Sequence, residues 1–139
     1  MIAISPYFTF NGNCREAMTF YQGCFGGTLS FQSVANAPLS EELPQKMKDC
    51  ILQASLTNEH LVLLATDMVA EEGLTKGNSI SVFLSFNEEQ EIRECYQKLS
   101  EGGQCSHPLE MNFWGGLFGA IIDKYGNYWL LNYPQVQQP

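Results

Sequence analysis

The sequence predicts an α+β fold made of two copies of one strand–helix–strand–strand–strand module. Residues 10–27 read FNGNCREAMTFYQGCFGG, and residues 86–103 read FNEEQEIRECYQKLSEGG. Both stretches open with Phe-Asn, close with Gly-Gly and carry an aromatic residue at the same helical position. Each follows one apolar, strand-like segment and precedes three more. We therefore expect module one, about 6–67, and module two, about 78–133, to form paired mixed sheets around a shared cavity, with the helices outside, in a single domain of residues 1–139.

The sequence of the first predicted helix contains signals for its start, its buried face and its end. Asn13 is a typical N-cap residue, with Glu16 at the third helical position. Gly26 and Gly27 supply the left-handed conformation that ends a helix. Apolar residues recur at helical spacing, which predicts one buried face: Ala17, Phe20, Tyr21 and Cys24.

The second predicted helix repeats this pattern. Asn87 is the expected N-cap, Gln90 takes the third helical position, and Gly102 with Gly103 ends the helix. The predicted buried face consists of Ile92, Cys95, Tyr96 and Leu99.

The remaining strands follow the same order in both modules. In module one, YFTF precedes the helix; TLSFQSVA, a connection of about 35–49 and a hairpin turning at Thr57–His60 come after it. In module two, SISVFLSF precedes the helix; GQCSHPLE and a hairpin turning around Asp123–Asn127 follow. Gly126 suits the positive φ that such a turn requires.

Composition and charge narrow the classes of partner. The chain has 7 basic and 15 acidic residues, a formal charge of −8, and no cluster of Lys or Arg, so we do not expect nucleic acid as a partner. No apolar run approaches the ~20 residues of a membrane span, so we expect no membrane partner. The first ten residues lack the features of a signal peptide, which favours the cytoplasm. The 5 cysteines form no CxxC pair, so we expect free thiols.

Three segments carry a resemblance to a known family: YFTFNGNCREAMTFYQGCFGG, LSEGG after the second helix, and FWGGLFGAIIDKYGNYWLLN. Over roughly Pro6 to Tyr133 the chain resembles the PhnB-like branch of the vicinal oxygen chelate superfamily, which contains glyoxalase I, bleomycin-resistance proteins and extradiol dioxygenases. The resemblance implies paired βαβββ modules, a small-molecule cavity and a homodimer. Branch members are often labelled 3-demethylubiquinone 3-methyltransferases. No glycine-rich strand-to-helix loop for S-adenosylmethionine occurs here, so we do not expect that activity.

The usual metal ligands of the superfamily are missing. The resemblance implies His, Gln or Glu ligands on the first and last strands of each module, but YFTF, LVLLAT, SISVFLSF and YWLLNY contain no His or carboxylate. Asp67 lies just past one strand, and Asn132 is a weak ligand where the family's catalysts carry Glu. We therefore expect no metal and no other cofactor. A divalent ion held by Gln53, His107 and Glu110, or across a dimer interface, is the alternative.

Polar candidates for ligand binding come from two places. Many PhnB-like proteins carry His and Glu on the third strand, where this chain has Gln53 and Ser55, two apart and therefore on one face. Gln53 can hydrogen-bond to a ligand but cannot act as a general base near neutral pH. His107, with Glu110 three residues on, fits either an acid–base pair or an ordinary loop.

The aromatic residues fit either a packed core or the wall of a cavity. Phe113 and Trp114 lie next to Gly115-Gly116, and large aromatics on such a loop can line or cover a pocket, so we expect them to contact a ligand. Tyr7 and Trp129 are secondary candidates.

These observations favour a PhnB-like, metal-free protein that binds a small organic molecule in an aromatic-lined cavity. A metal-dependent lyase or dioxygenase of the vicinal oxygen chelate type is the alternative function. A protein-interaction scaffold without a ligand is a third interpretation. An apolar pocket with convergent polar groups would separate the binding protein from the scaffold.

Overall fold

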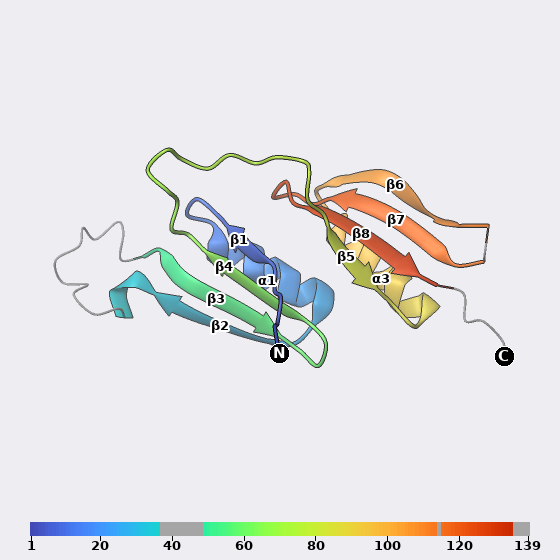
Figure 1. Ribbon diagram of the computed structural model, residues 1–139, viewed down its shortest axis with the longest axis horizontal. Coiled ribbons are helices and arrows are strands. Elements are labelled where there is room, and N and C mark those ends of the chain that lie inside the picture. Colours follow the sequence, from blue (N-terminus) through green and yellow to red (C-terminus); the bar gives the residue numbers. More distant parts are fainter. Residues whose placement is uncertain (37–48, 114, 135–139) are drawn as a thin grey trace. The chain divides into compact units, whose positions relative to one another are not determined.

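The computed structural model describes residues 1–36, 49–113 and 115–134. The chain divides into two compact units, Met1–Thr75 and Lys76–Pro139. Within the described residues each unit contains a four-stranded mixed sheet and one α-helix (Figure 1). The predicted α+β class and the repeated module are thereby confirmed. The shared cavity and the single domain concern both units together and stay predictions.

The first unit has the predicted element order. Its elements are β1 (Tyr7–Thr9), α1 (Cys14–Phe25), β2 (Thr28–Ser33), the 3-10 turn η1 (Val34–Asn36), β3 (Ile51–Thr57) and β4 (Val62–Thr66). The sheet order is β1-β4-β3-β2, with β1 parallel to β4 and the other pairs antiparallel. The predicted connection of about 35–49 lies mostly outside the described residues.

The second unit repeats the topology. Its elements are β5 (Val82–Ser85), α3 (Glu89–Leu99), β6 (Gln104–Met111), β7 (Leu117–Ile122) and β8 (Tyr128–Tyr133). The sheet order is β5-β8-β7-β6, with β5 parallel to β8. In each unit, therefore, the strand before the helix pairs in parallel with the last strand.

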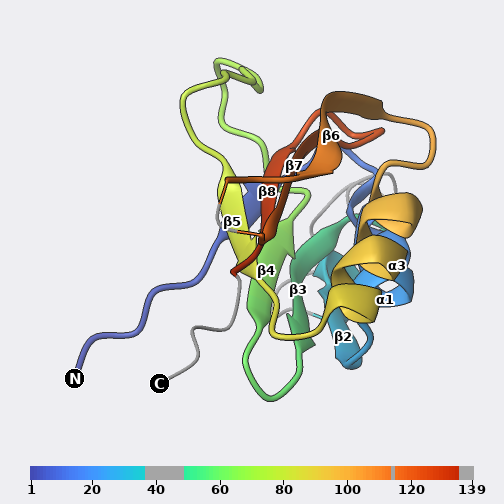
Figure 2. The same ribbon diagram turned by 90° about the vertical axis from the view of Figure 1, so that its right-hand side faces the viewer.

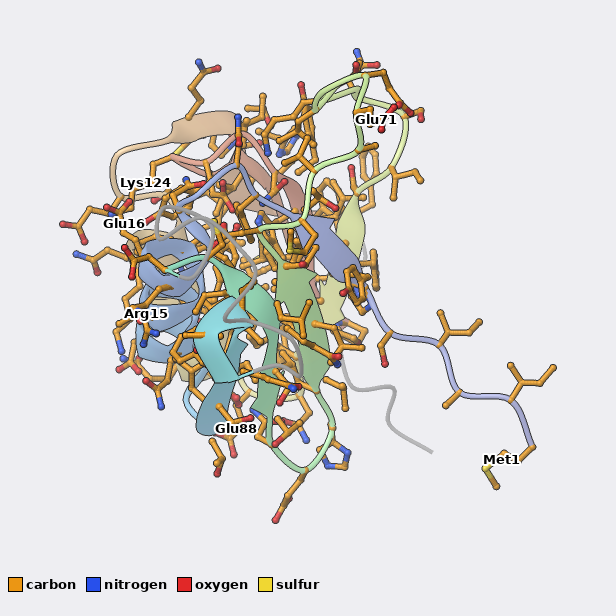
Figure 3. The ribbon with its side chains drawn as sticks, turned by 90° about the vertical axis from the view of Figure 1, so that its left-hand side faces the viewer. Met1, Arg15, Glu16, Glu71, Glu88 and Lys124 are labelled. Atoms are coloured by element: carbon orange, nitrogen blue, oxygen red, sulfur yellow. The ribbon has the colours of Figure 1, made fainter. Side chains whose placement is uncertain are left out.

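Each helix covers one face of its own sheet (Figure 2). The buried face of α3 contains Ile92, Cys95 and Leu99, as predicted. The buried face of α1 lies slightly to one side of the predicted stripe, because Phe20 and Cys24 are only half-buried. The fully buried residues of α1 are still at helical spacing: Cys14, Ala17, Met18 and Tyr21. Glu16 is exposed on α1 (Figure 3), and the guanidinium of Arg15 lies over the Phe31 ring of β2, 4.6 Å from its centroid.

The helix starts differ from the prediction in how they are capped. Asn13 is the N-cap of α1 but makes no side-chain cap hydrogen bond. Instead, one carboxylate oxygen of Asp67, from the end of β4, accepts the backbone N–H of Cys14 at 2.9 Å. The N-cap of α3 is Glu88, so the prediction of Asn87 was wrong by one residue; the backbone is still extended at Glu88, which delays the first helical turn.

The repeated Gly-Gly pairs have a common structural cause. The second glycine of each pair lies against the end of the third strand of its module. A Cβ added to Gly27 would lie 2.5 Å from the carbonyl oxygen of Thr57, and one added to Gly103 would collide with the carbonyl oxygen of Ile122. Both positions thus require a residue without a side chain.

No helix among the described residues is long and apolar enough to cross a membrane. Glu71 lies in the exposed loop between β4 and β5 (Figure 3).

A candidate binding pocket on the second sheet

The second sheet presents a row of side chains on the face away from α3. Along β7, Leu117, Gly119 and Ile121 are buried, so the alternate residue Phe118 lies on the opposite face. The register pairs Phe118 with Glu110 on β6 and with Asn132 on β8. Directly paired residues share a face of the sheet, with Cβ atoms roughly 5 Å apart. Three adjacent strands therefore bring a carboxylate, a phenyl ring and an amide side by side.

His107 joins this row because β6 is irregular. Residues three apart on a regular strand project to opposite faces. The register of β6 against β7 shifts between His107 and Glu110, and this irregularity lets both side chains reach the same pocket. The His107 ring meets Phe118 edge to face, with 5.5 Å between the ring centroids.

A pocket of about 530 Å³ lies over this row, within the second unit. Its lining combines two phenyl rings, a thioether and four polar side chains: His107, Glu110, Met111, Asn112, Phe113, Phe118 and Asn132. Phe113 and Met111 are highly exposed, so they form a rim more than a floor.

A tight turn presents Phe113 at that rim. The backbone N–H of Asn112 donates to the carbonyl oxygen of Gly116 at 2.8 Å, and the Asn112 side-chain oxygen accepts the Gly116 N–H at 3.0 Å. Gly115 has a φ of +84°, which favours glycine. Gly115 and Gly116 thus help to build the turn that follows Phe113.

The helix on the far side of the sheet holds β6 in place. The Tyr96 hydroxyl donates to the backbone carbonyl oxygen of His107 at 2.9 Å. Gly119 makes room for this contact, because a Cβ there would lie 2.7 Å from the Tyr96 ring. Burial, followed by the neighbouring Cys105, raises the pKa of the Tyr96 hydroxyl, which therefore remains a neutral donor.

The other predicted site residues lie elsewhere. Tyr7, Gln53 and Ser55 share the face of the first sheet away from α1, where Gln53 pairs with Gln32 and the Ser55 hydroxyl meets that of Ser30 at 2.9 Å. They belong to the first unit and do not line the pocket.

Trp129, a secondary candidate for ligand contact, lies in the core. Trp129 is 1% exposed, and its indole N–H donates to a carboxylate oxygen of Asp123 at 2.7 Å, so it belongs to the core of the second unit. Trp114 lies outside the described residues.

Sequence reasoning missed part of the pocket. It did not single out Met111, Asn112 or Phe118, and it considered Asn132 only as a weak metal ligand. The β7 sequence LFGAII contains no polar residue, so it does not show which face of the sheet Phe118 occupies. Nothing local in the sequence connects Asn132 with Glu110, because their proximity depends on the pairing of three strands.

The Asp67 side chain connects three segments of the backbone by hydrogen bonds. Its two carboxylate oxygens accept the backbone N–H groups of Gly12, Cys14 and Ile51, each at 2.9 Å. Among the described residues, no group of three or more His, Cys, Asp or Glu side chains could hold a metal ion.

The cysteines are free thiols among the described residues, and two of them, Cys14 and Cys95, are buried. Burial, with the Asp67 carboxylate as a second cause, raises the pKa of the Cys14 thiol to about 12. This thiol therefore stays protonated and packs as a small apolar group.

The chain is similar in sequence and in structure to several known proteins. The model of the glyoxalase/bleomycin resistance protein/dioxygenase superfamily matches residues 3–131. Protein YjdN of Escherichia coli (strain K12) is 27% identical over 146 residues, covering 98% of this chain and 97% of that protein. Protein PA1353 from Pseudomonas aeruginosa has a crystal structure with a TM-score of 0.83 and 32% identity, covering 98% of this chain and 100% of that one. A Bacillus cereus structure described as a putative 3-demethylubiquinone-9 3-methyltransferase, PhnB protein, has a TM-score of 0.72 and 26% identity, covering 95% and 99% of the two chains.

Proposed function

The chain belongs to the glyoxalase/bleomycin resistance protein/dioxygenase superfamily, and from this premise we propose that it binds a small organic molecule in the pocket of the second sheet. Membership of a superfamily indicates the fold, whereas function depends on the residues of the site. Ligand binding is therefore inferred from the residues of the pocket itself.

One observation carries the proposal: a pocket of about 530 Å³ combines apolar walls with several polar groups that converge on it. Ligand sites in proteins are typically concave, mainly apolar and lined by a few polar groups that orient the ligand. Phe113 and Phe118 offer faces or edges for a planar ring, while His107, Glu110 and Asn132 offer hydrogen bonds. The binding of a planar organic molecule needs no metal and no cofactor.

A metal-dependent lyase or dioxygenase is the second candidate, because His107 and Glu110 lie in the same pocket. Both are residue types that bind divalent ions. Asn132, beside them, is a weak ligand, and Gln53 belongs to the other unit. The described residues thus offer two good ligands where catalytic sites of this type use three, and the set does not fit a resident metal well.

The methyltransferase description of the Bacillus cereus relative does not transfer to this pocket. S-adenosylmethionine, like other nucleotide-containing cofactors, commonly lies at the carboxyl ends of a doubly wound parallel sheet. The two described sheets are mixed, and only β1 with β4 and β5 with β8 are parallel.

The remaining partners are proposed from the sequence and its resemblance. We place the protein in the cytoplasm as a homodimer, with neither nucleic acid nor a membrane as a partner. The formal charge of −8 supports the exclusion of nucleic acid.

The experiment is a screen of mono- and bicyclic aromatic fragments, neutral, cationic and anionic, followed by amide chemical shifts in two-dimensional NMR. We expect at least one fragment to shift residues 107–118 and Asn132 in a saturable way. Phe118→Ala should weaken that fragment about tenfold, the loss expected for one stacking contact. Phe83→Ala, on the same sheet face but outside the pocket lining, is the matched control. No saturable fragment, or equal losses in both variants, would overturn the proposal.

A further inference from the structure

We propose that the ligand of this pocket is a planar aromatic cation that carries N–H donors, such as an aryl amidinium or aryl ammonium group. This inference rests on the proposed binding function and specifies its chemistry. It follows from the hydrogen-bonding state of the polar groups that line the pocket.

The first group is the Glu110 carboxylate. It lines the pocket, and among the described residues it forms no ion pair and accepts no hydrogen bond. No lysine or arginine of the described chain is among the lining residues. An ionised carboxylate can only accept hydrogen bonds, so a ligand group facing it must supply donors, and a positive charge strengthens the contact.

The second group is the His107 ring, whose donor is already engaged. Its Nδ1 lies 2.8 Å from the carbonyl oxygen of Pro108, and a carbonyl can only accept. Nδ1 must therefore carry the hydrogen of that bond, which leaves Nε2 of the neutral ring as an acceptor. In its neutral form the imidazole thus presents a lone pair at Nε2, which selects for a donor in the same way as Glu110.

The third group is the side-chain amide of Asn132. Asn132 pairs with Phe118 on β7, and Phe118 pairs on its other side with Glu110. The Asn132 side chain forms no hydrogen bond within the described part of the chain, so its oxygen is a further acceptor and its NH2 a donor. The Asn112 side-chain oxygen is already used by the Gly116 N–H. Acceptors therefore outnumber donors among the groups that remain for a ligand.

The apolar side chains of the pocket favour a ligand with a planar ring. The Phe118 ring lies between Glu110 and Asn132 in the sheet, so a flat ligand over it would place its edge toward both acceptors. An aromatic ring also attracts a cation to its face. A planar ring with an N–H-bearing cationic substituent satisfies the phenyl rings and the acceptors together.

The test uses three probes of nearly equal shape: 2-naphthamidine, 2-naphthamide and 2-naphthoate, which are cationic, neutral and anionic. We expect the amidine to bind most tightly and the carboxylate most weakly, with a difference of about three- to tenfold between amidine and amide, because Glu110 is exposed to solvent. Dissociation constants come from isothermal titration calorimetry at a fixed ionic strength, since salt screens the charge.

Glu110→Gln is the decisive variant, because it keeps the shape and removes the charge. It should abolish the preference for amidine over amide while leaving amide binding within about twofold. Glu101→Gln removes an exposed carboxylate outside the pocket lining and should leave the preference unchanged.

The outcomes separate this inference from the proposed function. If the naphthamide or the naphthoate binds as tightly as the amidine, or if Glu110→Gln keeps the preference, the cation inference is wrong while the binding pocket stands. If none of the three probes binds and the wider fragment screen is also negative, the proposed function fails first.

Discussion

At the scale of single residues, the carboxylate of Asp67 connects three backbone segments that are distant in sequence. It accepts N–H groups before helix α1, at the first turn of α1 and at the start of β3. The contacts to Cys14 and Ile51 are buried, and the Cys14 amide has no cap from the Asn13 side chain at the helix start. Asp67 thus replaces the local capping box that the sequence predicts.

Asp67→Asn tests this role. The amide keeps one acceptor oxygen and turns an NH2 group toward a backbone N–H, so at least one buried donor loses its partner. We expect a loss of about 2–3 kcal/mol in the free energy of unfolding, measured by urea denaturation, because hydrogen bonds to charged groups are the strongest of their kind.

Asp49→Asn, an exposed aspartate just before β3, is the control and should change stability by less than about 0.5 kcal/mol. Equal stability of the two variants would show that the Asp67 contacts contribute little.

The role of Asp67 could be predicted only in part from the sequence. Its place just past a strand is visible in the sequence. Its hydrogen-bond partners lie 53, 55 and 16 residues away. No local pattern specifies such contacts, because they depend on how the sheet and helix pack. Trp129 is a similar case: its position on a strand was predicted, but whether it faces the core or a ligand was not.

At the scale of elements, the Gly-Gly pairs are the clearest repeated feature of the sequence. Gly26 is the C-cap of α1, as predicted, whereas α3 is capped by Ser100, two residues before the predicted stop at Gly102. In both modules the second glycine of the pair lies against the end of the third strand. The helices, the hairpins and their turns could all be predicted, because glycines, caps and periodic apolar residues are local signals.

Gly103→Ala tests the close approach without the complication of a positive φ, which this residue lacks. The new methyl group would collide with the backbone at the end of β7, and backbone cannot move aside as a side chain can. We expect a loss of about 1–3 kcal/mol in the free energy of unfolding, measured by thermal and urea denaturation.

Gly23→Ala is the matched control for that substitution. Gly23 lies within helix α1 and has open space around its Cα, so alanine there should stabilise the protein by up to about 1 kcal/mol. If Gly103→Ala were equally well tolerated, the close packing against β7 would not explain the repeated glycine.

The register of β6 against β7 could not be predicted from the sequence. His107 and Glu110 are three residues apart, a spacing that separates them on a regular strand. Only the irregular pairing of β6 with β7 brings both to one pocket. Irregularities of this kind arise from cross-strand hydrogen bonds and have weak sequence signatures, so the pair could be suspected but not placed.

At the scale of the whole molecule, the sheet faces away from the helices carry apolar surface. Tyr7 on β1 is 53% exposed and Phe83 on β5 is 56% exposed, and Ile80, just before β5, is 81% exposed. Large side chains exposed on a sheet face often mark a surface that another chain covers. In each unit taken by itself, such side chains are candidates for contact with a partner chain, and the homodimer that the family resemblance implies stays a prediction.

We therefore expect the protein in solution to have twice the 15.6 kDa mass of one chain, measured by size-exclusion chromatography with multi-angle light scattering. Because association follows mass action, the measured mass should fall only on dilution toward the dissociation constant. Phe83→Asp, which puts a charge on this surface, should shift the equilibrium toward the monomer, whereas Glu71→Gln in the exposed loop should not. A mass of 15.6 kDa at all concentrations would contradict the dimer.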